Sequence, residues 1–171
     1  MPVHNLFKEH HLRVYRYFLR QSGTETVAED MTQEVFLRAL RITSGGGQAG
    51  DRAWLFRIAR NLWIDRWRQM KRRPEKTELP ESAAVHPRQE AQMRLDDALH
   101  QLADEDREVF LLKEVGGLSY DEIAAACRTS HASVRSRLFR ARQSLRTYLA
   151  EPQAQQRQAQ QRQAQQHMGE S

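Results

Sequence analysis

The stretch from Trp54 to Arg73 most constrains how this 171-residue chain can fold. It contains no Gly or Pro, and its apolar residues recur at the three- and four-residue spacing of an amphipathic helix. From Arg52 to Arg73 there are eight Lys or Arg residues and one acid, Asp65. The helix therefore has an apolar side for a protein core and a nearly all-cationic side. A cationic side of this kind is typical of a surface that binds a polyanion, most simply DNA. The polar residues on that side are Arg57, Arg60, Asn61, Arg68 and Lys71.

Charge is distributed unevenly over the rest of the chain. The 27 basic and 22 acidic residues give a net charge of +5, which favours a nucleic-acid partner. Residues 74–108 hold ten acids and four bases, whereas residues 128–146 hold six Arg and no acid. Two basic blocks separated by an acidic spacer indicate a protein that contacts its partner at two places.

Helical periodicity on both sides of a Pro-containing segment predicts an all-α protein with two domains. We expect two small helical domains, residues 1–73 and 88–150, joined by a flexible acidic linker over 74–87. The expected core of the first domain includes Phe7, Leu37 and Leu40. Residues 151–171 form a Gln/Ala/Arg tail of low complexity, either disordered or an extension of the last helix, to which we assign no function.

Composition argues against several classes of function. The single cysteine, Cys127, cannot form an intramolecular disulfide and fits a reducing cytosol. No uncharged apolar run approaches the roughly 20 residues of a membrane span, and no signal peptide is evident, so we expect a soluble cytoplasmic protein. His4, His10 and His11 have no accompanying Cys or carboxylate cluster, which argues against a metal site. No nucleophile is paired with a base, so we expect neither catalytic residues nor a cofactor.

A helix-turn-helix is predicted within the second domain. Ser119 and Glu122 have the spacing of a capping box that opens a short helix, and Ser130 can cap a longer, Arg-rich one. The alternative is a helical hairpin that binds protein. The residues expected on the outer face of the longer helix are His131, Ser133, Arg135, Ser136, Phe139, Arg140 and Arg142.

An acidic patch is predicted on the helix expected over residues 26–42. Asp30, Gln33 and Glu34 are spaced i, i+3 and i+4, which places them on one face. The residues alone leave two interpretations open: a solvated helix face, or a docking surface for a basic partner.

Three segments in this order resemble the extracytoplasmic-function (ECF) sigma factors, the smallest class of bacterial RNA polymerase promoter-specificity subunits. The segments are AEDMTQEVFLRAL, RAWLFRIARNLWIDRWR and LSYDEIAAACRTSHASVRSRLFRARQSL. The resemblance covers roughly residues 5–150. It implies that the chain binds core RNA polymerase through its β′ and β subunits and binds promoter DNA. It also implies an anti-sigma factor as a partner.

The resemblance also implies roles for individual residues. The acidic patch, with Arg38, matches the surface that holds the coiled coil of the polymerase β′ subunit. The basic helix matches the element that reads and melts the −10 region, and Asn61 falls beside the place of a flipped base. The helix-turn-helix matches the domain that reads the −35 element. The residues implied there are His131, Ser133, Arg135, Ser136, Phe139 and Arg140.

Two positions depart from the family pattern. Gly45 stands near the place of a loop aromatic in related sequences, which puts the way the flipped base is held in doubt. Arg128 stands in the helix-turn-helix turn where Gly is common, so it must either adopt a left-handed conformation or alter the turn. Two other classes of function also remain open. One is a dimeric helix-turn-helix repressor, and the other is a nucleic-acid enzyme using carboxylates such as Asp30 and Asp65.

Overall fold

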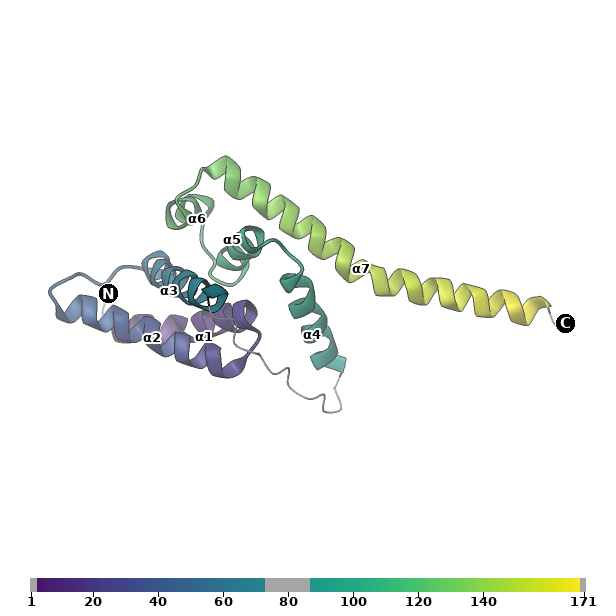
Figure 1. The fold of residues 1–171 in the computed structure, drawn as a ribbon, viewed down its shortest axis with the longest axis horizontal. Coiled ribbons are helices and arrows are strands. Elements are labelled where there is room, and N and C mark those ends of the chain that lie inside the picture. Colours follow the sequence, from purple (N-terminus) through teal and green to yellow (C-terminus); the bar gives the residue numbers. More distant parts are fainter. Residues whose placement is uncertain (1–2, 73–86, 170–171) are drawn as a thin grey trace.

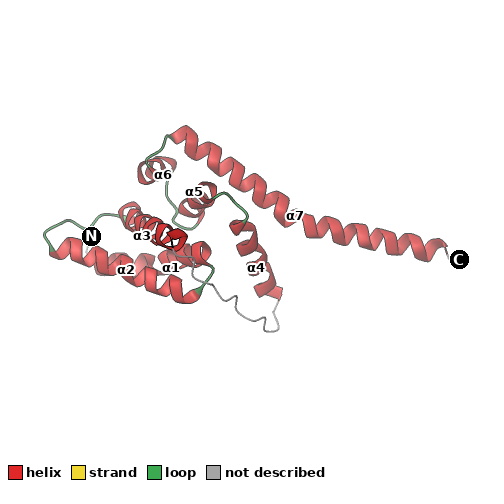
Figure 2. Cartoon of the chain, viewed as in Figure 1, coloured by secondary structure: helices red, strands yellow, loops and turns green. Residues whose placement is uncertain are grey.

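The computed structural model of the protein describes residues 3–72 and 87–169, and these form seven helices and no strand (Figure 2). The expectation of an all-α fold is confirmed. The linker expected over 74–87 lies outside the described residues except for Pro87, which begins a helix. The helices are α1 (Val3–Ser22), α2 (Glu25–Ser44), α3 (Arg52–Arg72), α4 (Pro87–His100), α5 (Asp104–Glu114), α6 (Tyr120–Cys127) and α7 (His131–Gly169).

The first half is a three-helix unit in which α1 and α2 pair and α3 packs on both of them (Figure 1). Only two residues separate α1 from α2, and Gly23 makes the reversal with a φ of 73°, a value that favours glycine. Tyr17 and Phe18 of α1 are fully buried, as are Leu55 and Phe56 of α3. The rings of Tyr17 and Phe56 meet edge to face with centroids 5.7 Å apart. This core fixes which side of α3 remains available to solvent.

The second half contains the expected helix-turn-helix, formed by α6 and the start of α7. The Ser119 hydroxyl accepts a hydrogen bond from the Glu122 amide at 3.2 Å, and the Glu122 carboxylate accepts one from the Ser119 amide at 2.7 Å. The predicted capping box is therefore confirmed. Arg128 ends α6 with φ 52° and ψ 49°, the left-handed conformation that one of the two alternatives required. The Ser130 hydroxyl accepts a hydrogen bond from the Ser133 amide at 3.0 Å, which begins α7.

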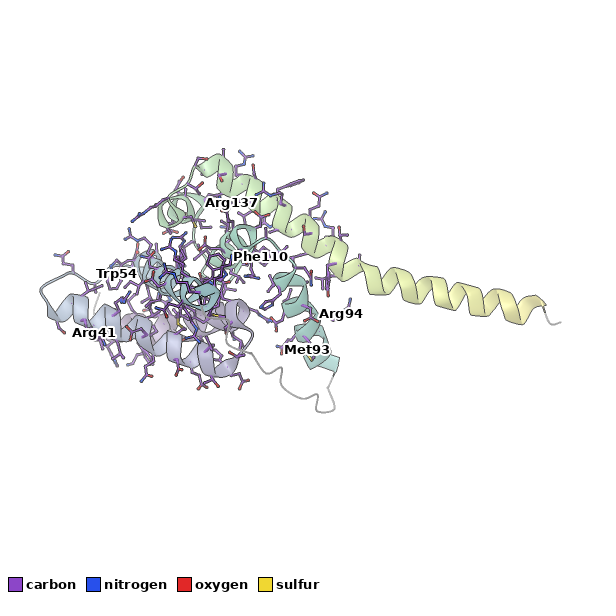
Figure 3. The ribbon with its side chains drawn as sticks, in the orientation of Figure 1. Arg41, Trp54, Met93, Arg94, Phe110 and Arg137 are labelled. Carbon is purple, nitrogen blue, oxygen red and sulfur yellow. The ribbon has the colours of Figure 1, made fainter. Side chains whose placement is uncertain are left out.

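The two halves also pack against each other. Helices α1 and α3 contact α4, α5 and α6, and the buried apolar residues form one continuous cluster across the junction. Polar pairs cross the same junction: Arg20 forms an ion pair with Asp96, and Arg107 donates a hydrogen bond to Gln21 at 3.3 Å. Side chains fill the space between the two helical groups (Figure 3).

Helix α7 extends far beyond the packed part of the molecule. It continues through Gly169, and its C-terminal half projects away from the other six described helices (Figure 1). Residues 151–169 of the Gln/Ala/Arg tail thus extend the last helix, which was one of the two alternatives considered. None of the helices in the described ranges is long and apolar enough to cross a membrane.

Candidate functional site: three polar surfaces

The exposed basic face of α3 is the first candidate surface. Arg57, Asn61, Arg68 and Lys71 are all exposed, and their spacing places them within about 80° of one another around the helix. Lys71 also lies over the ring of Trp67, with Nζ 3.9 Å from the ring centroid. Four of the five residues assigned to this face from the sequence are therefore together on one exposed stripe.

Arg60 is the exception, because it faces α5. Its side chain is only 15% exposed, and its Nε lies 2.9 Å from Oε1 of Glu108, which is 13% exposed. Nη2 of Arg60 also donates a hydrogen bond to Oε2 of Glu108 at 3.3 Å. Burial is the largest single effect and lowers the pKa of Arg60. The charge and hydrogen bond of Glu108, together with Cys127 and Tyr17 nearby, more than offset it, so the pKa ends above its usual value. The placement of Arg60 on the exposed basic face was therefore wrong in this structure.

A cavity of about 290 Å³ adjoins this ion pair at the junction of the two halves. Cys127 lines it, with Sγ 3.7 Å from Oε2 of Glu108. Burial, followed by the charge of Glu108, raises the pKa of the Cys127 thiol to about 11. A thiol that stays protonated at neutral pH is a poor nucleophile, which favours a packing role for Cys127.

The acidic patch of α2 is the second surface. Asp30 and Gln33 are exposed, whereas Glu34 and Arg38 are half-buried. The Glu34 carboxylate accepts a hydrogen bond from Arg41 at 3.3 Å, and Nε of Arg38 lies 4.0 Å from it. The helix brings the four predicted residues close together, and the two arginines partly offset the charge of Glu34.

An apolar groove lies beside the acidic patch, and the sequence interpretation missed it. The groove measures about 630 Å³, runs between α1 and α2, and includes Gln33 in its lining. Phe7, Leu37 and Leu40 were expected in the core, yet all three are exposed here. They are apolar at helical spacing, but neither α3 nor any other described helix covers them. Leu12 adds to the same surface. A charged patch next to an open apolar groove is typical of a protein docking surface.

The outer face of α7 is the third surface. His131, Arg135, Ser136 and Arg140 are exposed, and Phe139 is 67% exposed. Phe139 stands between two open hollows of about 280 and 550 Å³, both of which include Arg135. An apolar ring between hollows lined by arginine is suited to contact a thymine methyl or a sugar.

Three residues of α7, one of them His131, differ from a simple DNA-facing position. Ser133 is half-buried, and its amide belongs to the N-terminal cap of the helix. His131 packs near Tyr120, with ring centroids 5.4 Å apart. Arg137, labelled in Figure 3, turns toward α5 and pairs with Glu105 at 2.8 Å. Within the described ranges, no group of three or more His, Cys, Asp or Glu residues could hold a metal ion.

Both halves of the chain match families of known proteins. Residues 6–73 match the family model for sigma-70 region 2, and residues 92–145 match that for sigma-70 region 4. The chain is 36% identical over 155 residues to the ECF RNA polymerase sigma factor SigL of Mycobacterium tuberculosis, covering 85% of this chain and 88% of SigL. It is 29% identical over 153 residues to SigM of Bacillus subtilis, covering 85% of this chain and 94% of SigM.

The ECF sigma factor SigE of Mycolicibacterium smegmatis is 36% identical over 156 residues, covering 85% of this chain, which spans 61% of the length of SigE. Two solved structures are similar, each with a TM-score of 0.68. One is the sigma factor RpoE bound to the anti-sigma factor NepR from Bartonella quintana, with 27% identity and coverage of 85% of this chain and 96% of RpoE. The other is CnrH bound to the cytosolic domain of CnrY, with 25% identity and coverage of 87% and 88%.

The chain therefore belongs to the ECF RNA polymerase sigma factors, subunits that direct promoter-specific initiation of transcription.

Proposed function

We propose that the two halves of this sigma factor divide promoter recognition between two helices. The exposed stripe of α3 binds the opened −10 strand, and the outer face of α7 reads the −35 element in the major groove. The observation that carries this proposal is the presence of two separate cationic faces, one per half, on the segments that match sigma regions 2 and 4.

The stripe on α3 combines two kinds of contact that an opened strand needs. Arg57, Arg68 and Lys71 can bind phosphates without regard to sequence. Asn61 lies among them and offers one acceptor and two donors, which suits it to read the edge of an exposed base. Extruding a base costs a few kcal/mol, and hydrogen bonds near Asn61 would offset part of that cost. No catalytic residue is required for this role.

We further propose that the acidic patch of α2 docks on core RNA polymerase at the coiled coil of the β′ subunit. Asp30 and Gln33 supply exposed polar contacts, and the groove beside them supplies apolar area. Since core polymerase is cytoplasmic, the protein is expected to act there. An anti-sigma factor is also a proposed partner, because RpoE and CnrH, which have a similar fold, were solved with NepR and CnrY.

Run-off transcription with purified core polymerase tests the proposal. A library of DNA fragments is transcribed with core enzyme alone and with the full-length chain, and the transcript starts are mapped. We expect starts that appear only with the chain and share two conserved blocks upstream. The double variant Asp30→Ala, Glu34→Ala should lose core binding and transcription while keeping its helicity by circular dichroism. Transcription indistinguishable from that of core enzyme alone would refute the proposed function.

A further inference from the structure

Asp106 of α5 holds Arg140 of α7 through two hydrogen bonds. Nε of Arg140 donates to Oδ2 at 3.0 Å, and Nη2 donates to Oδ1 at 2.8 Å. The Asp106 side chain is 11% exposed, whereas that of Arg140 is 56% exposed. A buried carboxylate therefore fixes one side of a guanidinium whose other side faces solvent.

The pattern of donors determines what Arg140 can still bind. A guanidinium has five N–H donors in a planar fork. The contact with Asp106 uses Nε and one hydrogen of Nη2, which together form one edge of the fork. The outer hydrogens of Nη1 and Nη2 remain, and they form the end of the fork. That end can donate two parallel hydrogen bonds to guanine O6 and N7, so Asp106 leaves the base-reading donors available.

Other arginines of α7 are held differently. Arg142 pairs with Glu114 at 2.8 Å, but both side chains are 45% exposed. Arg137 pairs with Glu105, which is 71% exposed. Ion pairs with such exposed partners contribute little and rearrange easily in water. Asp106 is different because a buried carboxylate that lost its partner would be left without compensation for its lost hydration.

The neighbours of Arg140 place it on the surface proposed to contact DNA. Arg140 lines the same open hollow as Ser136 and Phe139. The hydrogen bonds that Arg140 donates to Asp106 also raise the pKa of Arg140, so the guanidinium stays charged under all practical conditions. Its orientation, rather than its charge, is what Asp106 can change.

We propose that Asp106 is a positioning residue for −35 recognition, holding Arg140 side-on so that the free end of its guanidinium reads a guanine. This inference rests on the proposed role of α7. The local sequence gives no sign of it, because the two residues belong to different helices and are 34 positions apart. The ordering of Arg140 before DNA arrives lowers the entropic cost of a bidentate contact and restricts the bases that it can accept.

The test uses the full-length chain and DNA duplexes. Wild-type protein first selects a preferred −35 sequence from duplexes with a randomised segment, and binding is then measured with every single-base change in that sequence. Arg140→Ala identifies the position that Arg140 reads. At that position, Asp106→Asn should lower the preference for guanine by about five- to tenfold. The loss is partial because Arg140 is still present, and this is part of the discrimination that one bidentate pair provides. Affinity for unrelated duplexes should stay equal or rise, because a negative charge is removed near the phosphates.

Glu114→Gln is the matched control, since it neutralises another acid of α5 that pairs with an arginine of α7. It should keep the guanine preference in full. Replacing the guanine with 7-deazaguanine removes the N7 acceptor, and should weaken binding by wild type more than by Asp106→Asn. In the Arg140→Ala background, Asp106→Asn should change no base preference, because its effect passes through Arg140. That last comparison separates positioning from a general loss of stability.

The outcomes distinguish the two levels of the proposal. If wild-type protein selects no preferred sequence, the proposed role of α7 fails. If it selects one, and Asp106→Asn keeps full preference where Arg140→Ala loses it, the positioning role of Asp106 is overturned. The role is equally overturned if Asp106→Asn alters base preference in the absence of the Arg140 side chain.

Discussion

Replacing Arg128 with glycine should stabilise the protein. Arg128 lies between the two helices of the helix-turn-helix with φ 52° and ψ 49°. A residue with a Cβ loses about 1–2 kcal/mol in this left-handed conformation. Glycine removes that strain, but its greater freedom in the unfolded chain costs about 0.5–1 kcal/mol. The net expectation is a gain of about 0.5–1 kcal/mol in the free energy of unfolding.

Equilibrium urea unfolding followed by circular dichroism can measure this gain. For a chain of this size, 1 kcal/mol shifts the melting temperature by roughly 2–4 °C, so a thermal scan provides a second measurement. Arg128→Ala is the control, because it removes the same charge and side chain but keeps the Cβ. Arg128→Asn should fall between the two, since asparagine tolerates this conformation better than most residues. Equal stability of the Gly and Ala variants would refute the reasoning.

Three further predictions concern single residues. Ser119→Ala should lower the free energy of unfolding by about 1 kcal/mol through loss of the capping box, and an unchanged urea midpoint would contradict this. Asn61→Ala should slow promoter opening about two- to tenfold while leaving closed-complex binding nearly intact. Permanganate footprinting measures that opening, and normal opening with a lowered melting temperature would make Asn61 structural. The pKa of the Cys127 thiol is raised to about 11 in the folded state. In the unfolded chain a cysteine thiol titrates at about 8.5, so the folded state binds this proton more tightly. Stability should therefore be full below about pH 8.5 and fall toward pH 11, and a Cys127→Ala variant with the same pH dependence would argue against it.

The helices could be predicted from sequence because their signals are local. Periodicity, a Pro-containing break and the Ser119–Glu122 spacing each depend on residues within a few turns of one another. The left-handed conformation at Arg128 could also be named as one of two alternatives, because the conformation of a turn depends on residues close together in the sequence. Which apolar side chains would be covered was harder to predict. Phe7 and Leu37 have helical spacing, but periodicity does not show whether another helix lies over them.

The side-chain partners of the candidate site could not be predicted, because they come from distant parts of the chain. Arg60 has the right residue type and nearly the right angular position for the basic face of α3. Its orientation is decided by Glu108, which is 48 positions away. The same holds for Arg140 and Asp106. A charge on a helix thus indicates a surface for binding, but the tertiary fold decides which charges are already paired.

The Arg60–Glu108 pair couples the two halves of the sigma factor thermodynamically. Because Arg60 is largely buried and pairs with Glu108, a phosphate that bound it would have to compete with that carboxylate, and separation of α3 from α5 would remove this competition. Separation and any contact of DNA with Arg60 are then linked equilibria, and linkage is reciprocal. A ligand that favours the separated form therefore strengthens DNA binding at Arg60. That DNA in turn strengthens binding of the ligand by the same factor. A ligand that binds only the packed form weakens DNA binding at Arg60 without touching α3.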